Sequence, residues 1–214
     1  ILRKNDIGYF IYTGGNDSMD TVYKLSVYCE EHNIDDIKVM GAPKTIDNDL
    51  GETDHCPGFG SAAKFIATAF TEIACDCFVY DAPSVTIVEV MGRNCGDIAL
   101  YAGIACGAEY IITPEKGYDK KELCDIILDG KKKGKMHNLI LLAEGVGGAS
   151  ELAKYIENET KIEARATVLG HVQRGGSPSA FDRVLASRMG SKAIELLLEG
   201  KTSRVVGIRK NEIY

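Results

Sequence analysis

Short apolar runs alternate with amphipathic stretches along this chain, and the alternation constrains the fold more than any other feature. Runs typical of buried strands lie at residues 7–12, 37–40, 85–90, 110–113, 139–143, 164–169 and 205–208. Stretches with apolar residues at helical spacing lie at 18–29, 61–75, 96–106, 120–132, 151–157 and 181–198, the first with Ser18 as its expected cap. Because crossovers between parallel strands are right-handed, this order predicts parallel sheets covered by helices on both faces, an α/β fold.

Charge and composition exclude several classes of protein. The 214 residues include 25 Lys and Arg against 31 Asp and Glu, a formal net charge of −6, which argues against nucleic acid as a partner. No apolar run is long enough for a membrane helix, and the first residues lack the apolar core of a signal peptide. We therefore expect a soluble, cytoplasmic protein that binds no membrane.

The number and spacing of the cysteines are typical of a protein from a reducing compartment. There are seven, an odd number, with no C-x-x-C pair and only four His to share a metal, so neither a disulfide framework nor a zinc site is expected. The basic run at 131–135 follows a predicted helix, where cations suit the helix dipole, and is interpreted as a solvated helix end.

The first polar loop follows the first predicted strand. Ligands of parallel α/β folds bind at the carboxyl ends of strands, so such loops are the places to look for chemistry. Here Gly14 and Gly15 allow backbone amides to approach a ligand, and the helix after them presents free N–H groups suited to a phosphate. Asn16 and Asp17 complete this loop. By itself the pattern is more typical of an ordinary βα turn.

The second polar loop, residues 43–49, carries two carboxylates. In an extended segment Asp47 and Asp49 would project to the same side, where they could hold Mg²⁺ together, or one could hold the metal while the other accepts a proton. Lys44 and Thr45 precede them. The alternative is a solvated acidic turn.

A third polar element follows the strand that carries Arg165. Residues 171–178 combine His171, Arg174 and a Gly-Gly-Ser turn, a set of donors suited to a phosphate monoester. Two shorter elements also stand at predicted strand ends: Met91-Gly92-Arg93, and Glu144 before a glycine-rich turn. Each could be a helix cap or a turn, but their shared position favours a common site.

At these loops the sequence resembles the phosphofructokinase family. The matching stretches, in the family's order, are 14–18, Pro43-Lys44-Thr45-Ile46-Asp47-Asn48-Asp49, 90–93, 143–145 and 165–178. The resemblance implies two Rossmann-like parallel-sheet domains with the active site in the cleft between them. Residues 1–58 and 173–214 would form a phosphoryl-donor-binding domain, and residues 59–172 a domain that binds fructose 6-phosphate.

The resemblance also implies a role for each matching residue. Asp47 would be the general base, with Thr45 in its site, Asp49 and Asn16 near Mg²⁺, and Arg93 stabilising charge on the transferring phosphoryl group. The sugar would be held by Met91, Gly92 and Glu144, and its 6-phosphate by His171, Arg174 and, from a neighbouring subunit of a homo-oligomer, Arg165. The donor would be bound by Gly14, Gly15, Asn16, Asp17 and Lys44. Phosphoryl transfer relies on such positioning and electrostatic stabilisation.

Two positions bear on the phosphoryl donor. ATP-dependent members usually have Gly where this chain has Asp17 and Lys44, and the pair resembles the pyrophosphate-dependent branch. We therefore predict a reversible, Mg²⁺-dependent transfer from pyrophosphate to the 1-hydroxyl of fructose 6-phosphate, with Lys44 neutralising the leaving phosphate. Two departures accompany this: Asn16 stands where many members have a metal-binding Asp, and Ser84 where ATP-using members commonly have a phosphate-binding Arg.

Three alternatives stay open. One is an ATP-dependent phosphofructokinase, and another is a catalytically silent regulatory subunit, which Asn16 favours and intact Asp47, Asp49 and Arg93 oppose. A nicotinamide-binding domain is less favoured because no G-x-G-x-x-G follows a predicted strand. The abrupt start in a strand also predicts that the chain is a fragment lacking an N-terminal phosphate turn and C-terminal residues.

Overall fold

The computed structural model describes residues 1–214 and divides them into two compact units. Unit 1 comprises Ile1–Ile46, Leu50–Gly60 and Pro178–Tyr214. Unit 2 comprises Asp47–Asp49 and Ser61–Ser177. The chain thus passes between the units at 60/61 and 177/178, where we expected 58/59 and 172/173. The segment Asp47–Asp49 belongs to unit 2 although both its neighbours in the sequence belong to unit 1.

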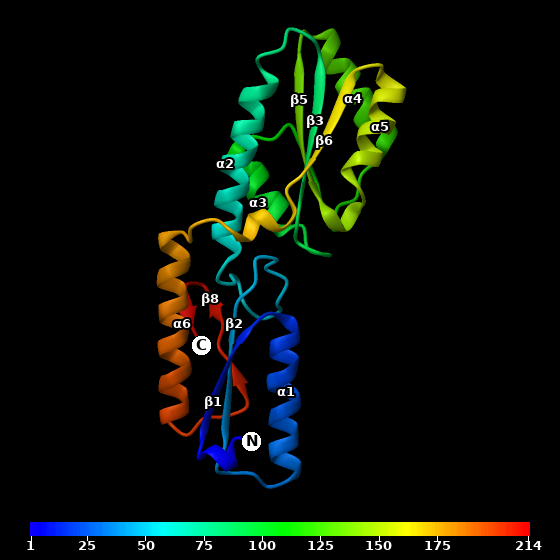
Figure 1. Ribbon diagram of the computed structural model, residues 1–214. Helices are drawn as coiled ribbons and strands as arrows, with labels where there is room; N and C mark the ends of the chain where they lie inside the picture. The colour runs from blue at the N-terminus through cyan, green and yellow to red at the C-terminus, as the bar shows by residue number, and fades with distance from the viewer. The chain divides into compact units, whose positions relative to one another are not determined.

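Unit 1 is built on a parallel sheet with the strand order β1-β2-β7. Its strands are β1 (Tyr9–Gly14), β2 (Lys38–Pro43) and β7 (Arg204–Val205), and its helices are α1 (Asn16–Glu31) and α6 (Ala180–Leu198). The two helices cover opposite sides of the sheet (Figure 1) because successive residues of β2 face opposite ways. Val39 packs with Val22 of α1, whereas Met40 joins the cluster that includes Leu185 of α6.

Two local predictions in unit 1 are wrong. Helix α1 begins one turn earlier than expected, with Gly15 rather than Ser18 as its N-cap. The single strand expected at 205–208 is split between β7 and a separate hairpin of β8 (Ile208–Arg209) and β9 (Glu212–Ile213). Lys210 and Asn211, which connect β8 to β9, both have positive φ, as in the two-residue hairpin loop that suits the twist of paired strands.

Unit 2 is a four-stranded parallel sheet with the strand order β4-β5-β3-β6. The strands are β3 (Ser84–Val90), β4 (Tyr110–Ile112), β5 (His137–Ala143) and β6 (Glu163–Val168), and the helices are α2 (Phe59–Cys77), α3 (Asp97–Cys106), α4 (Lys120–Lys132) and α5 (Ala149–Thr160). Helices α4 and α5 cover one face and α2 and α3 the other (Figure 1). This is the predicted α/β architecture.

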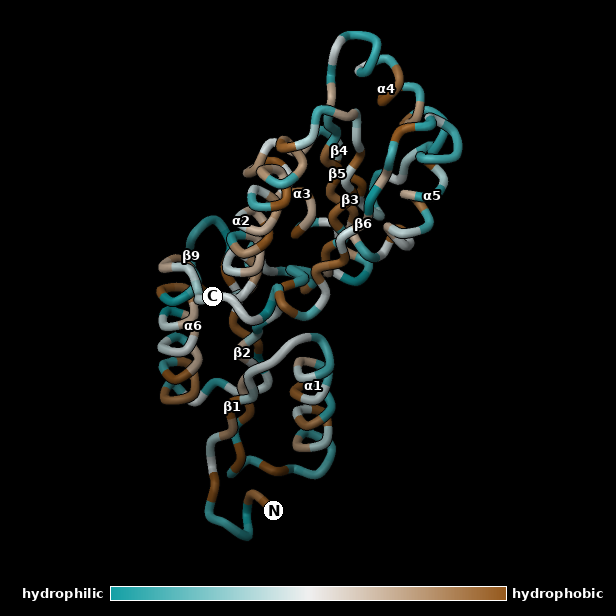
Figure 2. Tube along the Cα trace, turned by 45° about the horizontal axis from the view of Figure 1, so that its top comes forward, coloured by the Kyte–Doolittle hydropathy of each residue, from teal (hydrophilic) through white to brown (hydrophobic).

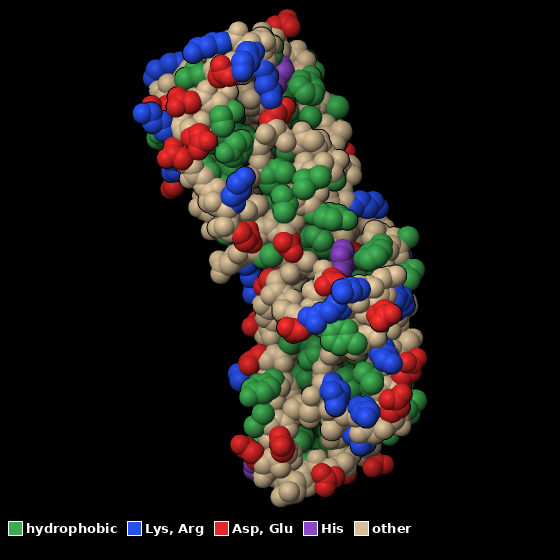
Figure 3. All heavy atoms as spheres, turned by 180° about the vertical axis from the view of Figure 1, so that it is seen from behind, with side chains coloured by type: hydrophobic (Ala, Val, Ile, Leu, Met, Phe, Trp, Pro, Cys, Tyr) green, Lys and Arg blue, Asp and Glu red, His purple; other side chains and the backbone are tan.

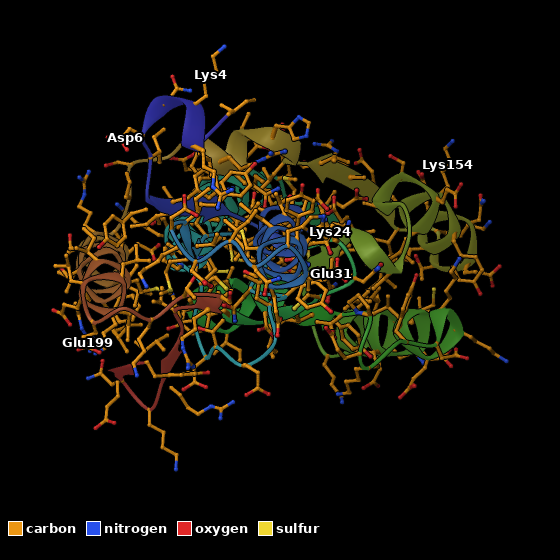
Figure 4. The ribbon with its side chains drawn as sticks, turned by 90° about the horizontal axis from the view of Figure 1, so that it is seen from below. Lys4, Asp6, Lys24, Glu31, Lys154 and Glu199 are labelled. Carbon is orange, nitrogen blue, oxygen red and sulfur yellow. The ribbon has the colours of Figure 1, made fainter.

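Burial in unit 2 follows the hydropathy of the sequence. The central strands β3 and β5 are buried along almost their whole length, and both sheets run through brown, hydrophobic parts of the tube in Figure 2. Helix α5 buries Leu152 and Ile156 against the sheet while Lys154 points away from the ribbon (Figure 4). Acidic and basic side chains are interspersed over the surface seen in Figure 3. None of the helices has the length and apolar character needed to span a bilayer.

The register of unit 2 brings the ends of three strands to one edge of the sheet. Val90 of β3 pairs with Ala143 of β5, and Glu89 pairs with Val168 of β6. The segments that follow these strands therefore start side by side. They are the loop Met91-Gly92-Arg93 and two short 3₁₀ helices, η2 (Glu144–Val146) and η3 (Gly170–Arg174). A further 3₁₀ helix, η1 (Arg3–Asn5), lies in unit 1 before β1.

Candidate functional site

The loop after β3 is fixed by the carboxylate of Glu144. Its Oε1 accepts hydrogen bonds from the backbone N–H groups of Gly92, at 3.2 Å, and Arg93, at 2.8 Å. Gly92 has φ +138°, which excludes most side chains, and Arg93 has φ +52°, a left-handed conformation that is costly for a non-glycine residue. A Cβ on Gly145 would overlap the Arg93 carbonyl oxygen, so the two loops are packed backbone to backbone.

The segment Asp47–Asp49 meets this loop within unit 2. Asp47 is 8% exposed, and its Oδ2 lies 3.7 Å from Nε of Arg93, whose side chain is 64% exposed. The structure therefore places a buried carboxylate beside a solvent-exposed cation. Asn48 has φ +56°, so the segment is not extended, and our expectation that Asp47 and Asp49 project to the same side of an extended strand is wrong.

Helix α3 also contacts the Asp47–Asp49 segment. Asn48 donates a hydrogen bond from Nδ2 to Oδ2 of Asp97, the first residue of α3, at 2.9 Å. The preceding amide, of Gly96, donates to Oε1 of Glu115 at 2.6 Å. Burial tends to raise the pKa of Glu115, but hydrogen bonds from the Gly96 amide and the Thr113 side chain outweigh it, so this pKa lies below its ordinary value.

The short helix η3 carries His171 and Arg174 at the same edge of the sheet. Both side chains are exposed, whereas Gln173 between them is buried. Gln173 accepts a hydrogen bond from the backbone N–H of Met91 at 3.3 Å and donates to the Gly170 carbonyl at 2.8 Å. The two basic residues therefore stand on a turn that is anchored to the loop after β3.

Arg165 lies apart from this cluster. It pairs with Thr86 in the middle of the sheet rather than at its carboxyl edge. Its guanidinium contacts Glu163 at 2.8 Å and lies 5.5 Å from the centre of the Tyr80 ring. The hydrogen bond and charge of Glu163 raise the pKa of Arg165 above its usual range. Within unit 2, Arg165 is thus not brought together with His171 and Arg174.

The residues predicted to bind the donor lie together in unit 1. Gly14 pairs with Pro43 at the ends of β1 and β2, and the Lys44 amide donates to the Gly14 carbonyl at 2.9 Å. Gly15 caps α1, and Thr45 follows Lys44 in the adjacent loop. The side chains of Asn16, Asp17 and Lys44 are exposed at this end of the sheet. The two loops thus present the helix N-terminus that the sequence predicted.

The predicted metal ligands are divided between the units, Asn16 in unit 1 and Asp49 in unit 2. The structure contains no group of three or more His, Cys, Asp or Glu side chains placed to hold a metal ion. The seven cysteines are free thiols.

Sequence reasoning missed three residues that organise this edge of unit 2: Gln173, Asp97 and Glu115. Each acts on backbone or on another polar side chain, so no motif of reactive residues marks it. The signal that could have found them is their position, because Asp97 begins α3, and Glu115 and Gln173 lie in the segments that follow β4 and β6.

Comparisons with known proteins place the chain among related enzymes. It is 54% identical over 213 residues to a protein of Clostridium acetobutylicum named ATP-dependent 6-phosphofructokinase, and 53% identical to one of the same name from Clostridium botulinum; each match covers 100% of this chain. The chain spans 64% of the length of these relatives. Among solved structures, the pyrophosphate-dependent phosphofructokinase of Marinobacter aquaeolei matches with a TM-score of 0.87 and 33% identity, covering 99% of this chain and 57% of that one.

These relatives overturn our prediction of pyrophosphate as the phosphoryl donor. The proteins at 53–54% identity are named as ATP-dependent, whereas the pyrophosphate-dependent enzyme is 33% identical. The prediction rested on the charges of Asp17 and Lys44, and both side chains are exposed to solvent. An acidic residue in the first turn of a helix is also a common stabilising feature, so Asp17 needs no role in excluding a nucleotide.

The fold and the strand-end loops agree with one family. The family model described as Phosphofructokinase matches residues 1–197, which include all of unit 2, most of unit 1 and every predicted site residue. The chain belongs to the phosphofructokinase family.

Proposed function

We propose that the protein carrying this chain is an ATP-dependent 6-phosphofructokinase, which transfers the γ-phosphoryl group of ATP to the 1-hydroxyl of fructose 6-phosphate. The observation that carries this proposal is the 54% identity, over the whole chain, to a protein named for that activity. The geometry of unit 2 supports it, because a buried carboxylate, Asp47, lies beside a cation, Arg93, at the carboxyl edge of a parallel sheet.

In this proposal Asp47 accepts the proton of the sugar hydroxyl as its oxygen attacks the γ-phosphorus. Burial favours this role, because it shields the Asp47 carboxylate from solvent, and the guanidinium of Arg93 lies nearby, 3.7 Å away. The Arg93 side chain is exposed and joined to Asp47 only at 3.7 Å, so it can turn toward the transferring phosphoryl group and stabilise its charge.

The sugar phosphate would bind to unit 2. Met91, Gly92 and Glu144 would contact the sugar ring, and His171 and Arg174, both exposed on η3, would bind its 6-phosphate. Arg165 lies in the middle of β6 and contacts Glu163, and we propose that it serves the sugar phosphate of a neighbouring subunit in a homo-oligomer. Unit 1 would bind the nucleotide through Gly14, Gly15 and Thr45, with Asn16, Asp17 and Lys44 around its phosphates.

Mg²⁺ would be held on the unit 2 side by Asp49, with Asp47 next to it in the same segment, because carboxylate oxygens are the hard ligands that this ion prefers. Asn16 of unit 1 would offer a further amide oxygen. When bound, the ion would neutralise charge on the donor phosphates. The residues of the chain would align the hydroxyl, the base and the phosphoryl group.

The experiment is a donor comparison on the purified protein. We expect turnover of fructose 6-phosphate with ATP and Mg²⁺, and a kcat/KM for ATP well above that for pyrophosphate. Asp47→Asn, which keeps the shape of the side chain but removes the base, should lower kcat by about 10²- to 10⁴-fold. Faster turnover with pyrophosphate than with ATP would refute ATP as the donor. A folded protein that is inactive with both donors would refute the proposed enzyme activity and favour a catalytically silent subunit.

A further inference from the structure

The attachment of Asp47–Asp49 to unit 2 needs a physical cause. The residues on either side of this segment belong to unit 1, so chain connectivity alone would place it there. Two of its contacts within unit 2 differ in geometry. The ion pair from Asp47 to Arg93 is long, at 3.7 Å, and ends on an exposed side chain, whereas the bond from Asn48 to Asp97 is 2.9 Å and ends on a carboxylate. Geometry therefore favours the second contact as the stronger one.

Asn48 is suited to this contact by its backbone. With φ +56° it occupies a left-handed conformation that Asn tolerates better than most residues. This turn separates Asp47 and Asp49, so the orientation of Asn48 determines where both carboxylates lie. A bond that holds the Asn48 side chain consequently holds the two acidic residues as well.

Asp97 is in turn held firmly. It is the first residue of α3, where a carboxylate interacts favourably with the helix dipole. The Gly96 amide before it is bound by Glu115, and Gly96 is packed so closely against Glu115 and Thr113 that a Cβ there would overlap them. The start of α3 is thus fixed against the loop after β4, and Asp97 is presented to Asn48 from a rigid base.

We propose that Asp97 is a positioning residue that holds the Asp47–Asp49 segment in unit 2 through Asn48. The effect of Asp97 on turnover rests on the proposed function, in which Asp47 is the base. The contact between Asn48 and Asp97 is independent of that function. Asp97 touches no reacting atom in this proposal, and it acts by limiting the places that Asp47 can occupy.

The test compares Asp97→Ala with Asp119→Ala in the intact protein. Asp119 is a matched control because it is the N-cap of α4 in unit 2, and its side chain accepts hydrogen bonds from the Lys121 and Glu122 amides rather than from residues 47–49. We expect Asp97→Ala to lower kcat by about tenfold or more with KM for fructose 6-phosphate within about threefold, as for a lost charge-assisted hydrogen bond that orients a catalytic group. Asp119→Ala should change kcat by less than about twofold.

A double-mutant cycle separates positioning from general destabilisation. Asn48→Ala and Asp97→Ala should be non-additive, both in kcat and in the unfolding equilibrium constant measured with urea, with a coupling of about three- to tenfold. Asp97→Asn, which keeps an acceptor oxygen, should recover most of kcat. Additive effects in the urea cycle, or equal kcat losses for Asp97→Ala and Asp119→Ala, would overturn the proposal. A wild-type protein without turnover would refute the proposed function instead, and the urea cycle would still test the contact.

Discussion

Replacing Glu144 offers the sharpest test of how the loop after β3 is held. Glu144→Ala removes the carboxylate that accepts the amides of Gly92 and Arg93, while Glu144→Gln keeps an acceptor oxygen in nearly the same place. Both variants lose the negative charge. The difference between them therefore reports on the two hydrogen bonds, and the effect they share reports on the charge.

The magnitude follows from the geometry. A hydrogen bond to a charged group contributes about 1.5–3 kcal/mol. Glu144 is only half-buried and the bond to Gly92 is long, at 3.2 Å, so we take the two bonds together as about 2 kcal/mol of unfolding free energy. Arg93 holds a left-handed backbone conformation that costs about 1–3 kcal/mol. Without Glu144 this cost is no longer offset, and we expect the loop to relax and carry the Arg93 guanidinium away from Asp47.

The assay pairs urea unfolding with steady-state kinetics. Glu144→Ala should lose about 2 kcal/mol of unfolding free energy and Glu144→Gln less than about 1. If Arg93 stabilises the transferring phosphoryl group, kcat should fall by about 10²-fold or more in the Ala variant, as for other single electrostatic contacts in a transition state. A Glu144→Ala protein with wild-type stability and kcat would show that the loop keeps its conformation without the carboxylate, and would refute the reasoning.

Two further predictions concern neighbouring positions. Gly145→Ala should lower the unfolding free energy, because the new Cβ would overlap the Arg93 carbonyl and approach Pro114 to 3.0 Å. It should also lower kcat, because Arg93 would be displaced. The same two assays check this, with Gly148→Ala as the control, since a Cβ at Gly148 would meet open space. Glu115 has a lowered pKa, so its contribution to stability is present above its unfolded pKa of about 4.3 and is lost as the pH falls through its folded pKa. Urea titrations across that range should therefore show less acid sensitivity in Glu115→Gln than in wild type, and identical pH profiles would contradict this.

The order and type of the elements followed from the sequence because hydropathy alternates with the period of each element. The central strands β3 and β5 are mostly apolar and are buried along almost their whole length, as expected for parallel strands covered by helices. The weakest element was the run at 205–208, which has too few residues to show a period. It is divided between a parallel strand and a hairpin, whose positive φ angles at Lys210 and Asn211 lack the usual glycine signal.

The candidate site was predictable only in part. The polar loops at strand ends identified the regions, because parallel strands bring their carboxyl ends to one edge. The conformation at Asn48 was not predictable, since a two-residue spacing of carboxylates suggests an extended segment and φ +56° overturns it. The sequence did place Arg165 within a predicted strand, but it could not indicate that its guanidinium lies beside Glu163 and Tyr80.

The assignment of Asp47–Asp49 to unit 2 has a mechanistic rationale under the proposed function. A general base must be within hydrogen-bond reach of the proton it accepts, and here that proton belongs to the sugar hydroxyl rather than to the donor. If the sugar phosphate binds to unit 2, a base attached to unit 2 keeps its distance from the hydroxyl whatever unit 1 does. A base attached to unit 1 would change that distance with every relative movement of the units, and a displacement of about 1 Å is enough to slow such a reaction by about 10²-fold. Under the proposed function, the hydrogen bond from Asn48 to Asp97 would therefore help to keep this distance constant during turnover.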